Sequence, residues 1–114
     1  MKTYNYATVP AETMEGLPGV SIRWAIGENV GAPNFALRII EVEPGAATPY
    51  HEHPWEHEAF ILEGEAILRD GQGEETKAGP GTCVYVKPDE SHCFMNEGEE
   101  TLRFICVIPH PPED

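Results

Sequence analysis

The sequence predicts an all-β fold: a single domain built as a small antiparallel β-barrel or jelly roll. Three observations support this prediction. The chain has 114 residues, which is enough for one hydrophobic core but too few for two. Short runs rich in β-branched and aromatic residues alternate with turns, and no long stretch has a helical period. The 11 glycines and 11 prolines are spread along the chain, as expected for many strands joined by tight turns.

Each expected strand is a short apolar or alternating run between turn signals. Residues 20–26, for example, place Val20, Ile22, Trp24 and Ile26 on one face. The sequence DGQG between two β-rich runs is a strong hairpin signal. The count indicates roughly nine or ten strands, a number typical of a barrel or jelly roll. The expected strands cover residues 20–26, 35–43, 47–53, 57–63, 66–70, 74–77, 82–86, 92–96 and 101–108.

The charge balance excludes two classes of partner. The chain has 20 acidic and 7 basic residues, for a formal net charge of -13. Such a surface repels phosphate backbones and anionic lipid headgroups, so neither nucleic acid nor a membrane surface is an expected partner. The first ten residues lack the apolar core of a signal peptide, and no apolar run reaches membrane-spanning length. A cytoplasmic location is the resulting expectation. The three cysteines suggest neither a disulfide framework nor a cysteine zinc site.

Three of the five histidines, His51, His53 and His57, lie within seven residues. On a strand, side chains two positions apart point to the same side, so the first two share a face. Such a pair is the usual way in which a β-sheet offers two imidazoles to one metal ion. Neutral imidazole suits Zn, Cu, Fe, Ni and Mn. The spacing therefore predicts a metal site.

The residues alone leave open whether His57 or Glu58 belongs to this site. If the chain stays extended after Pro54, strand parity turns the histidine inward and the glutamate outward. A shift of one residue at the proline bend would exchange them. Parity favours His57.

Two histidines remain as sources of a further ligand. His110 lies in a proline-rich tail, where ordered ligation is not expected. His92 follows a turn and shares its strand face with Phe94 and Asn96. A single histidine in such a place is more often structural, so its assignment as a ligand depends on a wider pattern.

That pattern resembles the two motifs of the cupin superfamily. The first motif reads Gly, five residues, His-x-His, three or four residues, Glu, six residues, Gly. Gly45, His51, His53 and Gly64 fit it, and His57 occupies the usual glutamate position. The glutamate that follows fits the looser spacing to the histidines but lies one residue too close to the final glycine.

The second motif reads Gly, five residues, Pro-x-Gly, two residues, His, three residues, Asn. Gly81, His92 and Asn96 match it in register, whereas Lys87 and Asp89 replace the proline and the glycine. The stretches PNFALRIIEVEPG, HPWEHEAFILEGE, GEET and FICVIP are also similar to the small manganese-containing monocupins with four histidine ligands.

This resemblance implies a cupin-type β-barrel, also described as a double-stranded β-helix or jelly roll, and a homodimer. It implies a divalent transition metal inside the mouth of the barrel, with Mn favoured and Fe, Cu, Zn or Ni as alternatives. The implied ligands are His51, His53, His57 and His92. We expect residues 1–34 to form an N-terminal strand segment that packs on the barrel or on a dimer partner. Residues 35–109 would form the barrel and residues 110–114 a loose tail.

Strand parity also suggests a substrate pocket beside the metal. Phe104, Cys106 and Ile108 alternate along the last expected strand. Such residues are more often plain core. Arg38 and Arg103 could face an anionic substrate, although charged side chains on strands more often lie at the surface. The candidate pocket residues are Phe94, Phe104, Cys106, Ile108 and Trp55.

Four imidazoles around an octahedral ion would leave two coordination positions open, which is typical of catalytic metal sites. The sequence therefore favours a metalloenzyme of the oxidoreductase or dioxygenase type, acting on a small and possibly anionic molecule. One alternative is a non-redox isomerase or lyase with the metal as Lewis acid, which usually needs a positioned acid or base. Another is a binding module that holds a metal or small molecule without turnover. Fold alone does not decide between them.

Overall fold

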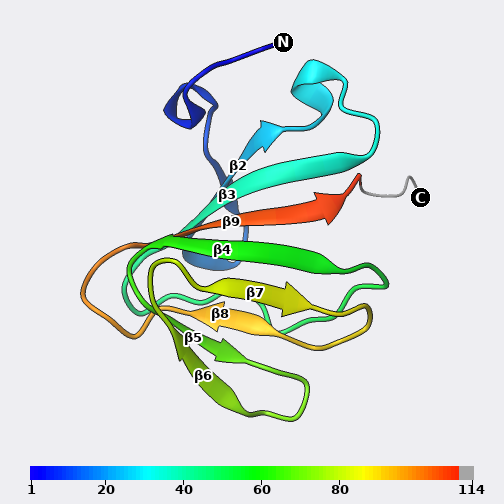
Figure 1. The fold of residues 1–114 in the computed structure, drawn as a ribbon. Coiled ribbons are helices and arrows are strands. Elements are labelled where there is room, and N and C mark those ends of the chain that lie inside the picture. The colour runs from blue at the N-terminus through cyan, green and yellow to red at the C-terminus, as the bar shows by residue number, and fades with distance from the viewer. Residues whose placement is uncertain (111–114) are drawn as a thin grey trace.

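The computed structural model of the chain describes residues 1–110 and is built almost entirely of β-strands (Figure 1). The all-β prediction is confirmed, and within the described residues the strands number nine. No helix in that part of the chain is long and apolar enough to cross a membrane. The strands are β1 (Glu12–Met14), β2 (Leu17–Ile26), β3 (Phe35–Val42), β4 (His57–Glu63), β5 (Ala66–Arg69), β6 (Glu75–Ala78), β7 (Cys83–Val86), β8 (Cys93–Met95) and β9 (Leu102–Pro109), with 3-10 turns at Tyr6–Thr8 and Glu28–Val30.

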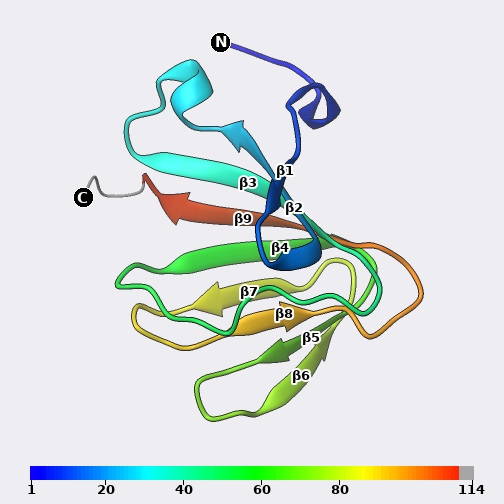
Figure 2. The ribbon, with the colours of Figure 1, turned by 180° about the vertical axis from the view of Figure 1, so that it is seen from behind.

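The strands form two antiparallel sheets. The larger sheet has the order β1-β2-β3-β9-β4-β7, and the smaller has the order β6-β5-β8. The connection between β3 and β4 crosses to the smaller sheet, where Ala47 bridges to Met95 and His51 bridges to His92. Figure 2 shows this connection running beside β8. The crossing brings the two histidine-bearing parts of the sequence side by side.

One hydrophobic core lies between the sheets. In β4 the buried residues alternate with more exposed ones, so Ala59 and Ile61 face inward and Phe60 faces outward, as parity predicts. Side chains from both sheets meet in the core, where the rings of Phe94 and Phe104 are stacked with their centroids 4.3 Å apart. Full burial of such a phenylalanine side chain stabilises the fold by about 1.5–3 kcal/mol relative to leaving it exposed.

The strand predicted at residues 47–53 does not form as a regular strand, and this prediction was wrong. Only the two isolated bridges remain. Pro49 has no N–H to donate to a ladder. In addition, the N–H of Phe94 donates to the Thr48 hydroxyl at 2.9 Å instead of to a backbone carbonyl. The connection is therefore fixed by irregular contacts to the strand beside it.

The face predicted for Ile26 was also wrong. Val20, Ile22 and Trp24 lie on the inner face of β2 as expected, but Ile26 is 42% exposed and Ala25 is buried. The register of β2 against β3 shifts between Trp24 and Ile26. Such a bulge inserts one residue and reverses the faces that follow it.

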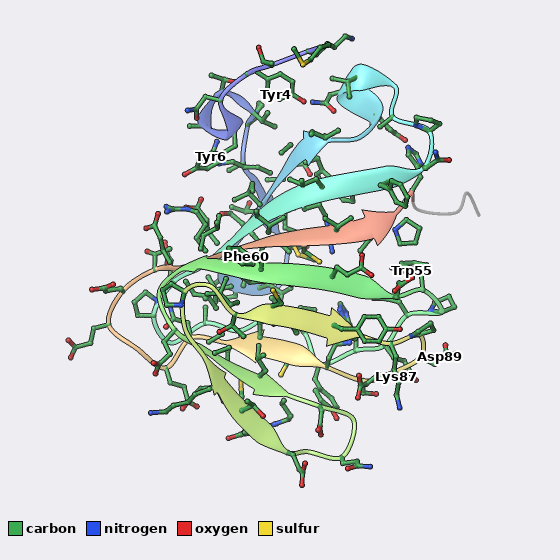
Figure 3. All side chains as sticks on the ribbon, in the orientation of Figure 1. Tyr4, Tyr6, Trp55, Phe60, Lys87 and Asp89 are labelled. Carbon is green, nitrogen blue, oxygen red and sulfur yellow. The ribbon has the colours of Figure 1, made fainter. Side chains whose placement is uncertain are left out.

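The N-terminal segment supplies the first two strands of the larger sheet. Strand β1 pairs with β2, and β2 pairs with β3. Tyr4 and Tyr6 lie over this end of the sheet (Figure 3). The hydroxyl of Tyr4 donates to the carbonyl of Ala25, and the guanidinium groups of Arg23 and Arg103 lie 5.8 and 6.0 Å from the centre of the Tyr6 ring. At the other end of the chain the tail predicted to be loose lies outside the described residues, except for His110.

Candidate metal centre

Four histidines converge at one end of the barrel. His51 and His92 are held by a pair of backbone hydrogen bonds of 3.2 and 2.9 Å between them. His53 follows in the connection, where its carbonyl accepts from the N–H of Asp89 at 2.7 Å. His57 is the first residue of β4. The crossing of the chain between the sheets therefore brings together residues that are up to 41 positions apart in the sequence.

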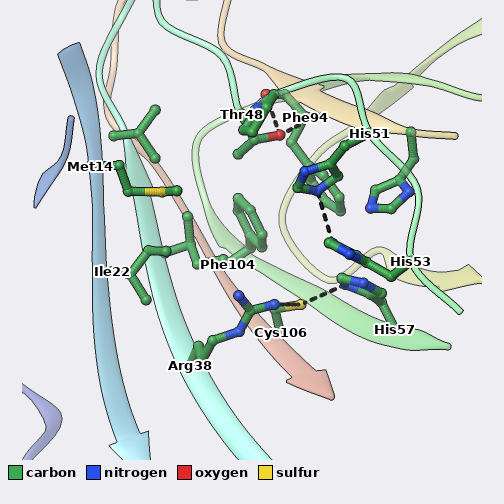
Figure 4. A pocket seen from close by; sticks show the side chains of 14 residues that line it. Met14, Ile22, Arg38, Thr48, His51, His53, His57, Phe94, Phe104 and Cys106 are labelled. Carbon is green, nitrogen blue, oxygen red and sulfur yellow. Dashed lines mark hydrogen bonds between the residues drawn. The ribbon is translucent and has the colours of Figure 1, made fainter. Parts of the chain in front are cut away.

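Three of these histidines form a compact group of possible ligand atoms. One ring nitrogen each from His51, His53 and His92 lies within 4.8 Å of the other two. The Nε2 atoms of His51 and His53 are only 3.1 Å apart (Figure 4). Two nitrogens bound about 2.1 Å from one ion lie roughly 3 Å apart when they occupy adjacent octahedral positions. The spacing and the all-imidazole donor set fit a divalent transition metal, so the cluster indicates a metal site.

His57 lies beside this group and faces inward. Its side chain is buried, whereas Glu58 is exposed on the opposite face of β4, so the structure places these two side chains as parity predicts. The His57 ring centre is 4.9 Å from the ring centres of both His53 and His92. Its Nδ1 lies 3.4 Å from the sulfur of Cys106, and its Nε2 is buried without a hydrogen-bond partner. A buried nitrogen without a partner is costly unless something binds it.

Neighbouring groups orient the rings. The Nδ1 of His92 lies 2.7 Å from the carbonyl of Glu90, and a hydrogen donated there leaves Nε2 with its lone pair. The indole of Trp55 stacks on the ring of His53 at 4.8 Å with an interplanar angle of 3°. Figure 3 shows Trp55, Lys87 and Asp89 at the same end of the barrel. Each contact restricts the direction in which a ring can point.

Asp89 occupies the position where the family motif has glycine, and its backbone conformation explains why glycine is usual there. Its φ of 64° lies in the left-handed region that favours glycine. Aspartate tolerates this conformation better than most residues do. The turn survives the substitution and still donates to the His53 carbonyl.

Burial keeps His51, His53 and His57 neutral. It lowers the pKa of His51 to about 4 and that of His57 to about 3, and the positive charges of neighbouring histidines and of Arg38 add to the effect. The pKa of His53 is lowered for the same reasons. Neutral imidazole is the form that binds a metal. These rings are therefore in the ligating state at neutral pH.

The lowered pKa values predict that the metal-free protein loses stability in acid. Histidines of the unfolded chain take up protons near pH 6.5, whereas His51 and His57 in the folded protein resist protonation down to about pH 4 and about pH 3. The unfolded state therefore binds more protons below pH 6.5, and the free energy of unfolding falls as the pH decreases from there towards 4. Urea denaturation at pH 7 and pH 5 checks this, because His57→Gln should lose less stability than the wild type. Equal losses in both proteins would contradict the prediction.

A cavity of about 80 Å³ adjoins the histidines (Figure 4). Among the predicted pocket residues, Phe94, Phe104 and Cys106 line it. Ile108 is buried in the core and Trp55 lies behind His53, and neither lines the cavity. None of the described residues that line it carries a carboxylate. The lining comprises Met14, Val20, Ile22, Arg38, Ile40, Thr48, Pro49, His51, His53, His57, His92, Phe94, Phe104 and Cys106.

The two arginines considered from the sequence lie in different places. Arg103 forms ion pairs with Glu41 at 2.7 Å and with Glu63 at 2.5 Å, outside the cavity. Arg38 lines the cavity instead. The signal that identifies it is the alternation along β3, which puts Arg38 on the same face as the buried residues Ala36 and Ile40.

Comparison with known proteins agrees with this architecture. The structure superposes on that of the polyketide cyclase RemF from Streptomyces resistomycificus with a TM-score of 0.90 and 36% identity, covering 98% of this chain and 82% of that one. A predicted oxalate decarboxylase from Thermotoga maritima superposes with a TM-score of 0.83 at 21% identity, over 96% of this chain and all of that one, which supports the fold alone.

Two curated proteins are similar in sequence. The oxalate-binding protein of Thermotoga maritima is 31% identical over 70 residues, 60% of this chain and 57% of that protein. The tetracenomycin polyketide synthase protein TcmJ of Streptomyces glaucescens is 28% identical over 81 residues, 70% of this chain and 54% of that protein. The match thus spans little more than half the length of each. The profile of the cupin domain matches residues 38–108, more than half of this chain, and the chain therefore belongs to the cupin family as a small single-domain member.

Proposed function

We propose that this protein is a metal-dependent enzyme whose ion is held by His51, His53, His57 and His92. The observation that carries the proposal is the group of closely spaced histidine ring nitrogens at the edge of a cavity. The buried Nε2 of His57, which has no partner, supports its inclusion as the fourth ligand. In that arrangement Nδ1 of His57 carries the hydrogen and donates it to the sulfur of Cys106.

The ion, when bound, would supply a Lewis acid that polarises a carbonyl or carboxylate oxygen. The chain's own residues do the rest. The stacked rings of Phe94 and Phe104 form an apolar wall for the carbon skeleton of a substrate. Met14 from the N-terminal segment adds to the apolar lining. The cavity is small, so only the reacting part of a larger substrate fits beside the histidines.

The reaction that we favour is ring closure of a compound with several carbonyl groups. The names of RemF and TcmJ both refer to polyketides, and RemF is called a cyclase. Aldol-type ring closure needs carbonyl activation but no oxidant, which suits a site with a Lewis acid and apolar walls. Among the described residues of the cavity there is no carboxylate, so the groups there that could move a proton are the thiol of Cys106 and the imidazoles.

Oxidation by dioxygen is the second candidate, and the donor set favours it. Four neutral imidazoles also suit Mn, Fe and Cu, which undergo redox chemistry, and the resemblance noted above favours Mn. This is the oxidoreductase or dioxygenase class expected from the sequence. The metal identity and the consumption of oxygen distinguish the two candidates.

Reconstitution with single metals tests the proposal. Metal-free protein is loaded with Zn, Mn, Fe or Cu and incubated with heptane-2,4,6-trione, which loses one water on aldol closure to give orcinol. We expect orcinol to form with Zn as well as with Mn. Oxygen uptake with Mn, Fe or Cu but not with Zn would support the dioxygenase class instead. Binding of metal and probe without any turnover would support a non-catalytic binding module.

We also propose that the protein forms a homodimer. Phe60 on β4 and Tyr85 on β7 are 40% and 62% exposed on the outer face of the larger sheet. Exposed aromatic residues close together are typical of protein interfaces. Light scattering of the purified protein should give twice the chain mass of 12.6 kDa, and a mass of one chain would contradict the proposal.

A further inference from the structure

We propose that Arg38 binds an anionic oxygen of the substrate, either a carboxylate or an enolate, and thereby determines which substrates the cavity accepts. The proposal rests on the proposed function for the metal beside it. It also makes a separate claim, because an arginine in this position would select anions even in metal-free protein.

The guanidinium of Arg38 lacks the partners that such a group requires. Its Nε is buried and makes no hydrogen bond. Its Nη2 lies 3.0 Å from the sulfur of Cys106, a weak acceptor. The ion pairs found among the described residues involve Arg23, Arg69, Lys77 and Arg103, but not Arg38. The positive charge at the cavity therefore has no carboxylate to balance it.

An unpaired arginine is unusual in this chain in particular. Acidic residues outnumber basic ones by 20 to 7, so a negative partner is easy to supply. Arg103 has two such partners. A partly buried charge without a counter-ion is destabilising, and it is commonly found where a ligand provides the missing charge. The unbalanced charge of Arg38 lies at the wall of the cavity beside the histidines, where a bound anion would compensate it.

The side chain is held in a fixed orientation towards the cavity. It extends from β3 on the inner face, and its guanidinium lies 5.4 Å from the centre of the Trp24 ring. It lines the same cavity as the histidines, and the Cys106 sulfur that it contacts lies 3.4 Å from Nδ1 of His57. Figure 4 shows it across the cavity from His51 and His53. A substrate oxygen could thus contact the guanidinium while a neighbouring oxygen approaches the histidines.

The chemistry of guanidinium indicates the class of ligand. Its planar donors match the two oxygens of a carboxylate or of the enolate of a 1,3-dicarbonyl compound. The apolar residues around it, including Ile22 and Ile40, suit the carbon skeleton of such a compound. A neutral ester or an inorganic cation would leave the positive charge uncompensated.

The test compares Arg38→Met with Arg69→Met, which removes the same charge from an exposed position on β5 outside this cavity. Calorimetry measures the Kd of acetoacetate and of its neutral methyl ester, with metal-free and with zinc-loaded protein. Near-ultraviolet absorbance measures the enolate fraction of bound acetylacetone at fixed pH. Arg38→Gln also removes the charge and serves as the second variant if Arg38→Met does not fold.

We expect the wild type and Arg69→Met to bind acetoacetate about tenfold or more tightly than the ester, and Arg38→Met to lose that preference. An Arg38-dependent rise in the enolate fraction, without preference for the acid, would identify enolate as the ligand. A preference that survives in Arg38→Met, or no preference and no enolate enrichment in the wild type, would overturn the proposal. An Arg38-dependent preference in a protein that binds no metal would refute the metal site but not the role of Arg38.

Discussion

Replacing His92 by alanine is expected to weaken metal binding by about a hundredfold or more. A site with four protein ligands binds zinc with about 10–16 kcal/mol, so the loss of one ligand removes roughly 3 kcal/mol. The backbone pair between His51 and His92 does not depend on the side chain, so the fold should persist. Competition for zinc or manganese between the metal-free protein and a chromogenic chelator measures the change in Kd.

Two controls make this result specific. His110→Ala removes a histidine that is not part of the cluster, and it should leave the metal Kd unchanged. His57→Gln and Glu58→Gln compare the two adjacent candidates on opposite faces of β4, and only the first should weaken binding. A stronger effect of Glu58→Gln than of His57→Gln would refute the assignment of the fourth ligand.

Replacing Gly64 by alanine is expected to destabilise the fold by roughly 3 kcal/mol. Gly64 has a φ of +77°, which by itself costs about 1–2 kcal/mol for other residues. A Cβ there would lie 2.6 Å from the carbonyl oxygen of Thr101 and 2.9 Å from the Cα of Leu102. Both are backbone atoms, so the overlap forces β4 and β9 apart and adds about 1–3 kcal/mol. Urea denaturation measures the loss.

Gly73→Ala is the matched control for this change. Gly73 also has a positive φ, +81°, but a Cβ there would meet nothing within 4 Å. It should therefore lose only the conformational part, about 1–2 kcal/mol. Equal losses at the two glycines would mean that the close approach of the chain at Gly64 contributes nothing. Glycine at the end of the first cupin motif is thus required for two reasons: the positive φ, and the lack of space for a Cβ beside Thr101 and Leu102.

Local patterns in the sequence predicted most of the fold and the orientation of the critical pair. The alternating sequence HEAFILE predicted which side chains of β4 face inward, because successive strand residues point to opposite sides. It correctly placed His57 inward and Glu58 outward. The prediction failed where an interaction outside the local sequence decides the outcome. The bulge at Ala25 and the hydroxyl of Thr48 that replaces a ladder carbonyl both depend on the neighbouring strand.

Arg38 shows the same limit at the site. Charged side chains on strands usually face solvent, which favoured the surface for Arg38, whereas the burial pattern of β3 puts it on the inner face. Only the pairing of β3 with β9, which sets Arg38 opposite Cys106, places the guanidinium beside the histidines. Ile108, two residues further along β9, faces inward as expected but lies in the core beyond the cavity.

Metal analysis of the untagged protein, purified without chelators, decides whether the four histidines hold a metal ion. We expect close to one divalent transition metal ion per chain in the wild type and in His110→Ala, and a loss of that metal in His57→Ala and His92→Ala. Circular dichroism of the same samples establishes that the variants are folded. A folded wild-type protein that takes up no transition metal, either during purification or when one is supplied, would refute the metal site.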